Sequence, residues 1–271
     1  MADTSWLQVC APEEAIELSA EDFCSDTLAS GGSPIDDYYG YVEHLLTLGD
    51  DAALAASPTL GRLLVLGLVS GVEFYFRDLL GGLLRCCPLC RKHAADQPLS
   101  FGALDYYGPD AVEFGLLDAT SLAGAREVRG RTQKLLALEI KPGSSVSAAL
   151  DEFDRVCHLR HAAVHARGAL GRGNATALGV GRDLGTRTMS VTLPALHDAA
   201  RVCHSVVRAY NRFVFEAIIF RWLGNDLFAG DWPTDRKLFA PLFTLVYSKR
   251  DKLAPTNAYL CYRKLPVAAA Q

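Results

Sequence analysis

The segment from Pro194 to Leu223 constrains the fold most, because its apolar residues repeat at helical spacing with no further proline or glycine inside the run. A second run, from Pro58 to about Arg85, has the same period and ends at the sequence CCPLC, where Pro88 interrupts a helix. Helices of this length bury an apolar face only by packing against other helices. The sequence therefore predicts an all-α fold, an up-and-down helical bundle.

Shorter apolar patterns predict further helices over residues 35–48, 110–117, 121–139 and 147–167. Between these helices, Gln97 to Gly108 is rich in turn formers, and Gly168 to Gly185 is rich in glycine and has no period. We expect both stretches to be loops. Thr188 to Leu193 alternates enough to predict a short strand or an extended link.

The C-terminal tail from Asp231 to Gln271 contains four prolines, at positions 233, 241, 255 and 266. Proline interrupts helices, so we expect only short elements that wrap the bundle. The predicted organisation is an N-terminal extension over residues 1–33, the bundle over 34–223, and a proline-containing C-terminal extension over 224–271.

The composition limits the class of protein. A chain of 271 residues with 50% hydrophobic residues can bury a substantial core, and a net charge of -4 gives no overall attraction to nucleic acid. The acidic N-terminus has no apolar run typical of a secretory signal, and charged residues interrupt the most apolar stretch, Leu60 to Leu84. Eight irregularly spaced cysteines suit a reducing compartment. We expect a soluble, cytoplasmic protein without a membrane partner.

Arginine and histidine are concentrated in the helix expected over residues 147–167. Thirteen consecutive positions contain Arg155, His158, Arg160, His161, His165 and Arg167. At about 100° per residue, Arg160 falls on the apolar seam of the helix beside Cys157, while His161 and His165 flank that seam.

This combination suits RNA cleavage without a metal. The reaction needs a group that moves protons near neutral pH and a permanent cation for the charge that develops on the phosphate. Histidine supplies the first, and the planar fork of arginine supplies the second. A structural interpretation competes with this one: Arg160 pairs with a carboxylate such as Glu73, and the histidines only flank a packed seam. Spacing alone favours the structural interpretation.

A family resemblance changes that balance. Arg160, four intervening residues and His165 resemble the RxxxxH motif of HEPN domains, and the surrounding LRHAAVHARG is very similar to the motif helix of that family. The segment GVEFYFRDLL resembles the glutamate-bearing helix of the RiboL-PSP-HEPN branch, and GRGN fits the glycine-rich loop that follows the motif there. The resemblance covers roughly residues 34–223.

The resemblance implies a HEPN-type bundle and a metal-independent endoribonuclease, often a toxin or antiviral effector, with an antitoxin partner in some cases. Such proteins are mostly homodimers whose two motif helices form one composite cleft. Arg160 and His165 would take the catalytic positions, His161 the polar position usually held by asparagine or aspartate, and Glu73 that of a supporting carboxylate. The expected reaction is attack by the ribose 2′-hydroxyl, leaving a 2′,3′-cyclic phosphate and a 5′-hydroxyl, with no cofactor.

The same region carries an excess of positive charge. Between Arg155 and Arg187 there are six arginines, one aspartate and no lysine or glutamate, a formal charge of +5. Four of these arginines are predicted to bind RNA phosphates: Arg155, Arg167, Arg172 and Arg182. The alternative is a flexible arginine-bearing loop that neutralises acidic surface.

Two other interpretations stay open. Cys87 and Cys90, followed by His93, have the spacing of half a zinc site, but there is no second CxxC, and we expect a helix-end turn without metal. The main alternative of another class is a non-catalytic dimeric helical module, an adaptor in which the arginines and histidines stabilise a subunit interface.

Overall fold

The computed structural model describes residues 9–11, 14–25, 31–109, 111–118, 120–181 and 187–266. Its internal contacts divide the chain into two units, Met1–Gly31 and Gly32–Gln271. In the first unit, a single turn of 3₁₀ helix, η2 (Ala20–Phe23), is the one regular element among the described residues, and it buries no side chain. Within the described ranges of the second unit the regular elements are all helices, which confirms the all-α prediction.

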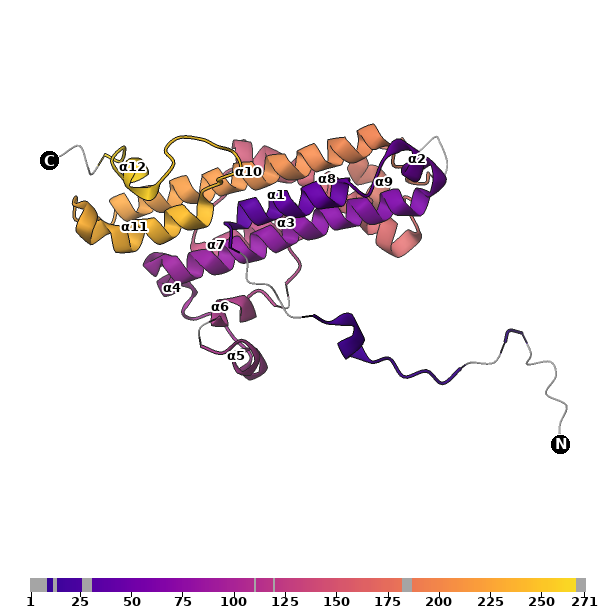
Figure 1. The fold of residues 1–271 in the computed structure, drawn as a ribbon, viewed down its shortest axis with the longest axis horizontal. Coiled ribbons are helices and arrows are strands. Elements are labelled where there is room, and N and C mark those ends of the chain that lie inside the picture. Colours follow the sequence, from indigo (N-terminus) through magenta and orange to yellow (C-terminus); the bar gives the residue numbers. More distant parts are fainter. Residues whose placement is uncertain are drawn as a thin grey trace. The chain divides into compact units, whose positions relative to one another are not determined.

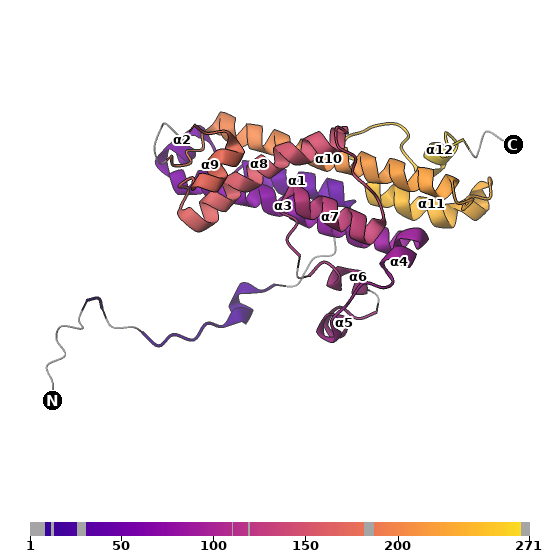
Figure 2. The same ribbon diagram turned by 180° about the vertical axis from the view of Figure 1, so that it is seen from behind.

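Four long helices of the second unit lie side by side in both views of the molecule: α1 (Pro34–Leu46), α3 (Pro58–Cys86), α8 (Ser145–Ala166) and α10 (Leu193–Leu223) (Figures 1 and 2). Shorter helices cover their sides and ends: α2 (Asp51–Ala56), α4 (Pro88–Ala94), α5 (Phe101–Tyr107), α6 (Val112–Gly115), α7 (Ala125–Leu136), α9 (Arg172–Leu178), α11 (Trp232–Val246) and α12 (Ala258–Tyr262).

Local chemistry sets the ends of the long helices. Ser57, Ser144 and Thr192 cap α3, α8 and α10, each accepting a hydrogen bond from a backbone N–H in the first turn. Helix α3 ends at Cys86, just before Pro88, as expected from the CCPLC sequence. Helix α10 has 31 residues and is the longest described helix, also as expected.

Helix α3 lies at the centre of the bundle and runs antiparallel to α1 and α8. Its Gly71 lies against the ring of Tyr41 from α1. On the other side, the rings of Phe76 and Phe153 from α8 have centroids 6.2 Å apart. Most leucine, valine and aromatic side chains along α3 are almost fully buried, so this helix supplies much of the apolar area that stabilises the fold.

Helix α10 runs parallel to α3 and is joined to it by buried polar groups. The Tyr75 hydroxyl contacts Asn211 Oδ1 at 3.2 Å and the Val207 carbonyl at 3.3 Å. The hydroxyls of Tyr210 and Thr132, from α7, lie 2.6 Å apart. Because each of these groups has a partner, burying it does not leave an unpaired polar atom in the core.

The C-terminal tail differs from its prediction. Helix α11 has 15 residues, with Pro233 in its first turn and Pro241 inside it. The carbonyl that Pro241 leaves without a helical donor belongs to Lys237, which is exposed, so water can satisfy it. Phe239 and Leu242 are fully buried, and α11 therefore contributes to the core instead of only wrapping it.

Two predicted loops contain helices. Gln97 to Gly108 includes α5, which Ser100 caps by accepting a hydrogen bond from the Ala103 N–H. The glycine-rich stretch includes α9, and glycines mark both ends of this helix. Gly171 is the N-cap, and Gly179, with φ of 70°, ends the helix. The sequence pattern locates the turn-forming residues correctly, but they cap short helices instead of forming loops.

Smaller corrections concern the flanking segments. The helix expected over 110–117 is the single turn α6, and that expected over 121–139 is the shorter α7. The strand considered over 188–193 is reduced to one bridge between Ala169 and Thr188. A membrane-spanning segment would need a long, nearly uncharged apolar helix, and the described residues contain none.

Candidate functional site

Helix α8 is packed along its first part and opens towards its C-terminus. Leu150, Phe153 and Cys157 are buried on its inner face, as the expected seam requires. Further along, Ala162 is buried but Val164, expected on the seam, is 46% exposed. The part of α8 that carries Arg160 and His165 is therefore accessible from more than one side.

Arg160 is half-buried and makes no hydrogen bond or ion pair with any described residue. It lies near Cys157, whose pKa is raised by burial, by Cys203 and by the charges of Asp154 and Glu73, while the charge of Arg160 opposes this shift. A guanidinium has five N–H donors, so Arg160 can donate to a bound anion without breaking an existing contact.

Glu73 stabilises a neighbouring segment. Its Oε1 accepts hydrogen bonds from the Leu122 N–H at 2.7 Å and from the Ser121 hydroxyl at 3.2 Å. These bonds fix the chain that leads into α7 against α3. The ion pair between Glu73 and Arg160 considered for the structural interpretation is not formed.

The two motif histidines lie together on the exposed flank of α8. The rings of His161 and His165 have centroids 4.5 Å apart and planes inclined by 46°. His158, on the same flank, is engaged differently: its Nδ1 lies 3.1 Å from Asn174 Oδ1 of α9, and its Nε2 lies 3.7 Å from Asp154. His158 therefore helps to anchor α9, whereas His161 and His165 face solvent.

Arg160 and His165 point in different directions from the helix. Five residues correspond to about 140° around the axis and a rise of about 7.5 Å. Consistent with this, Arg160 is half-buried, and His165 is exposed. The structure joins His165 to His161, but it shows no contact that joins His165 to Arg160.

The arginines predicted to bind phosphate have different environments. Arg155 forms an ion pair with Glu152 at 3.2 Å and donates to the Leu178 carbonyl at 3.4 Å. Arg167 is the exposed C-cap of α8, with φ of 50°, and Arg172 is the exposed first residue of α9. Arg182 lies outside the described residues.

Arg62 is a basic residue at this end of the bundle that the sequence did not identify as part of a site. It lies on α3 against Gly168, where an added Cβ would be 2.6 Å from Arg62 Nε. That nitrogen is buried and has no hydrogen-bond partner. Only the three-dimensional contact reveals it, because in the sequence Arg62 is a single charge within an apolar run.

The half zinc site is not extended by further ligands. Among the described residues, no three His, Cys, Asp or Glu side chains are grouped so that they could hold a metal ion. Cys87 and Cys90 are buried and contact Arg221 and Trp222 instead.

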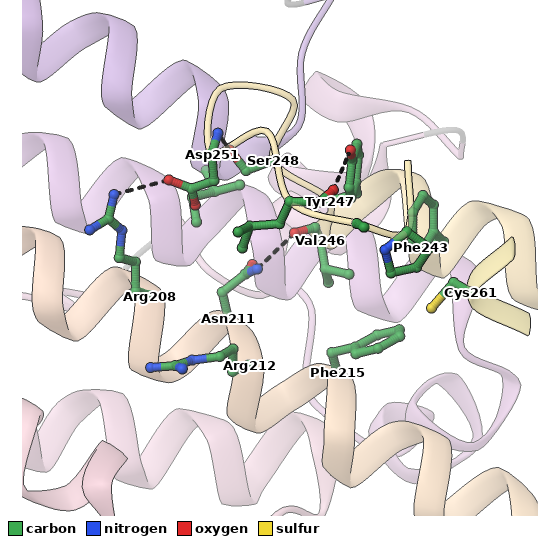
Figure 3. Close-up of a pocket in the computed structure, with 14 residues that line it drawn as sticks. Arg208, Asn211, Arg212, Phe215, Phe243, Val246, Tyr247, Ser248, Asp251 and Cys261 are labelled. Atoms are coloured by element: carbon green, nitrogen blue, oxygen red, sulfur yellow. Dashed lines mark hydrogen bonds and ion pairs between the residues drawn. The ribbon is translucent and has the colours of Figure 1, made fainter. Parts of the chain in front are cut away.

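A cavity of about 630 Å³ lies elsewhere, between α10, α11 and the segment that follows α11 (Figure 3). At its edge Arg208 forms an ion pair with Asp251 at 3.0 Å, and Asn211 donates to the Val246 carbonyl at 2.7 Å. No residue of α8 lines it, so the cavity and the motif helix are separate features.

Comparisons of the chain with protein-family models, with curated proteins and with solved structures returned no match.

Proposed function

We propose that this protein is a metal-independent endoribonuclease of the HEPN type, acting in the cytoplasm as a toxin or antiviral effector. The observation that carries the proposal is the arrangement on α8. Arg160, with no partner among the described residues, is followed at RxxxxH spacing by the exposed pair His161 and His165. The first of these features supplies a cation for a phosphate, and the second supplies groups that transfer protons.

In the proposed reaction a base removes the proton of the ribose 2′-hydroxyl, and the 2′-oxygen attacks the adjacent phosphorus. The bond from phosphorus to the 5′-oxygen breaks, and an acid donates a proton to that oxygen. His165 acts as base or acid, and His161 orients it or contacts the phosphate. Arg160 stabilises the negative charge on the phosphoryl oxygens. The products are a 2′,3′-cyclic phosphate and a 5′-hydroxyl.

A second copy of the chain completes the proposed site. Arg160 and His165 leave α8 in different directions, so an RNA phosphate would meet both most simply where two α8 helices face each other. Val164 of α8 and Leu63 of α3 are 46% and 57% exposed at this end of the bundle, where Arg62 contacts Gly168. They offer apolar surface for such a contact.

The proposed path of the RNA follows the exposed cations at the junction of α8 and α9. Arg167 and Arg172 are both exposed there, and Arg155 also holds α9 through the Leu178 carbonyl. Phosphate contacts of this kind are electrostatic, so RNA binding should weaken as salt concentration rises.

The test is incubation of the purified protein with RNA in excess EDTA. We expect wild-type protein to leave 5′-hydroxyl ends, and Arg160→Ala and His165→Ala to lose this cleavage. DNA should resist because it lacks the 2′-hydroxyl. His197→Ala, an exposed histidine on α10, is the matched control and should cleave normally. Undiminished cleavage by both α8 variants would contradict the proposal.

The exposed apolar side chains also favour the adaptor alternative. Phe74 of α3 is 57% exposed, and together with Val164 and Leu63 it offers apolar surface for a protein interface without catalysis. If His165→Ala leaves cell toxicity unchanged while Arg160→Ala weakens a dimer, the adaptor is the better description.

A further inference from the structure

Cys87 and Cys90 form a buried pair at the junction of α3 and α4. Cys87 links the two helices: its N–H donates to the Leu83 carbonyl at 2.9 Å, and its carbonyl accepts from the Arg91 N–H at 3.0 Å. Both cysteines are fully buried. The two sulfurs share one donor, because Arg221 Nη2 lies within hydrogen-bonding distance of both, so they lie near each other across the CPLC turn.

Two consecutive residues at the end of α10 donate to these sulfurs. Arg221 Nη2 lies 2.8 Å from Cys90 Sγ and 3.5 Å from Cys87 Sγ. Trp222 Nε1 donates to Cys87 Sγ at 3.2 Å. The Cys87 sulfur is thus surrounded by donors, one of them a permanent cation, which is the environment that stabilises a thiolate.

The charge on Arg221 points to the same ionisation state. Its Nε is buried without a partner, its Nη1 donates to the Leu136 carbonyl, and no described carboxylate forms an ion pair with it. Arg221 is half-buried, and a guanidinium withdrawn from water is destabilising unless an anion compensates it. The Cys87 thiolate is the anion that the site offers.

The pKa shifts of the three cysteines at this junction agree with a thiolate at Cys87. The hydrogen bond from Cys90 lowers the pKa of Cys87 to about 5, against the opposing effect of burial. Cys90 keeps its proton, because its thiol donates to Cys87 and its pKa is raised. Burial raises the pKa of Cys86 to about 12, although it is the residue directly before Cys87. The donors therefore distinguish Cys87 from the cysteine beside it.

We propose that Cys87 and Cys90 are a redox-active dithiol that a peroxide oxidises to a disulfide. The Cys87 thiolate attacks one peroxide oxygen, the oxygen–oxygen bond breaks, and Cys87 becomes a sulfenic acid as hydroxide leaves. The Cys90 sulfur then attacks the Cys87 sulfur. The sulfur–sulfur bond forms, the sulfur–oxygen bond of the sulfenic acid breaks, and the thiol proton joins the departing hydroxide to give water. Because both sulfurs are buried, the site favours a small oxidant over a bulky protein disulfide.

Oxidation would also alter the packing around the pair. Arg221 joins α10 to α4 through the sulfurs and to the end of α7 through the Leu136 carbonyl. A disulfide carries no charge, so oxidation removes the anion that compensates the guanidinium. The inference does not depend on the ribonuclease proposal, because its test measures thiols and not RNA cleavage.

The sequence makes the test direct. Trypsin cleaves after Arg85 and Arg91, so Cys86, Cys87 and Cys90 fall in a single peptide, CCPLCR. The full-length reduced protein is treated with hydrogen peroxide, blocked with a maleimide under denaturing conditions and digested. We expect this peptide to carry three maleimides before oxidation, and afterwards one maleimide on Cys86 with a disulfide between Cys87 and Cys90.

Variants separate this chemistry from general oxidation. Cys90→Ser should trap the Cys87 sulfenic acid as a dimedone adduct, and Cys203→Ser, a change at a buried cysteine of α10, should leave disulfide formation unchanged. Arg221→Gln removes a charge-assisted donor from the thiolate. It should shift the ratio of oxidised to reduced glutathione at half oxidation about tenfold towards reducing conditions.

Arg221→Lys, which keeps a cation but not the planar guanidinium, should shift that ratio less than Arg221→Gln does, and both variants are checked for native helicity by circular dichroism. The proposal is overturned if the peptide still carries three maleimides after peroxide has oxidised free glutathione in the same tube. It is also overturned if the disulfide includes Cys86.

Discussion

The rings of His161 and His165 lie 4.5 Å apart on the exposed flank of α8, while Arg160, one residue before His161, is half-buried. This relationship gives the two histidines separate tests. If His165 transfers the proton, His165→Ala should lower the cleavage rate by about 10²–10⁴-fold, the usual contribution of a general acid or base.

His161 should behave differently. If it orients His165, His161→Asn, which keeps a hydrogen-bonding side chain, should retain most of the activity that His161→Ala loses. Initial rates of RNA cleavage at saturating substrate measure both variants. Equal loss in His161→Asn and His161→Ala would instead assign proton transfer to His161.

The divergence of Arg160 and His165 predicts complementation between inactive subunits. In a mixed dimer of Arg160→Ala and His165→Ala chains, one composite site has both residues intact and the other has neither. Random mixing should therefore restore about a quarter of the wild-type rate, because half of the dimers are mixed and each has one good site of two.

This measurement needs co-refolding or prolonged mixing of the two variants, followed by the EDTA cleavage assay. A mixture of wild-type protein with the double variant is the control: their mixed dimers contain no intact composite site, so activity should fall with the square of the wild-type share, to about a quarter at equal amounts. Failure of the mixed variants to recover activity, with dimers present, would place Arg160 and His165 of one subunit in the same site.

The sequence predicted the helices whose apolar period is long and uninterrupted, and it failed where a signal was local. Helix α10 was predicted almost to the residue, because 31 residues in one period leave few alternatives. Helix α11 was missed because Pro241 normally interrupts a helix, and only burial of Phe239 and Leu242 against the bundle outweighs that cost.

The candidate site could be predicted only in part. The stripe of histidines on α8 follows from spacing, and the ring contact of His161 with His165 agrees with it. The hydrogen bonds of Glu73 to Ser121 and Leu122 join residues nearly fifty positions apart. The contact of Arg221 with Cys90 joins residues 131 positions apart. Such pairs leave no local pattern, because they depend on how the helices pack.

Glu73 should matter mainly for stability. Glu73→Ala leaves the Leu122 N–H without its acceptor and should lower the free energy of unfolding by about 1–3 kcal/mol. Glu73→Gln keeps a carbonyl oxygen at the same position and should lower it less. Urea denaturation followed by circular dichroism measures both. Glu152→Ala, which removes an exposed ion pair with Arg155, is the control and should have little effect.

Asp78 of α3 should make the fold less stable as pH rises. Burial, together with the charge of Asp37, raises its pKa from 3.8 to about 6, against the opposing effect of Arg85. The folded protein therefore binds this proton more tightly than the unfolded chain does. Its contribution to stability is fully present below about pH 4 and is lost as pH rises through 6.

Asp78→Asn removes that ionisation and should stabilise the protein at pH 7, by about 1 kcal/mol once the partial exposure of the side chain is allowed for. The gain should shrink as pH falls from 7 towards 4, because the wild-type carboxyl becomes protonated and neutral. Urea midpoints at several pH values test this. Asp105→Asn, at an exposed position of α5, should show no such trend. A constant gain for Asp78→Asn across that range would show that shape or hydrogen bonding, and not charge, distinguishes the two side chains.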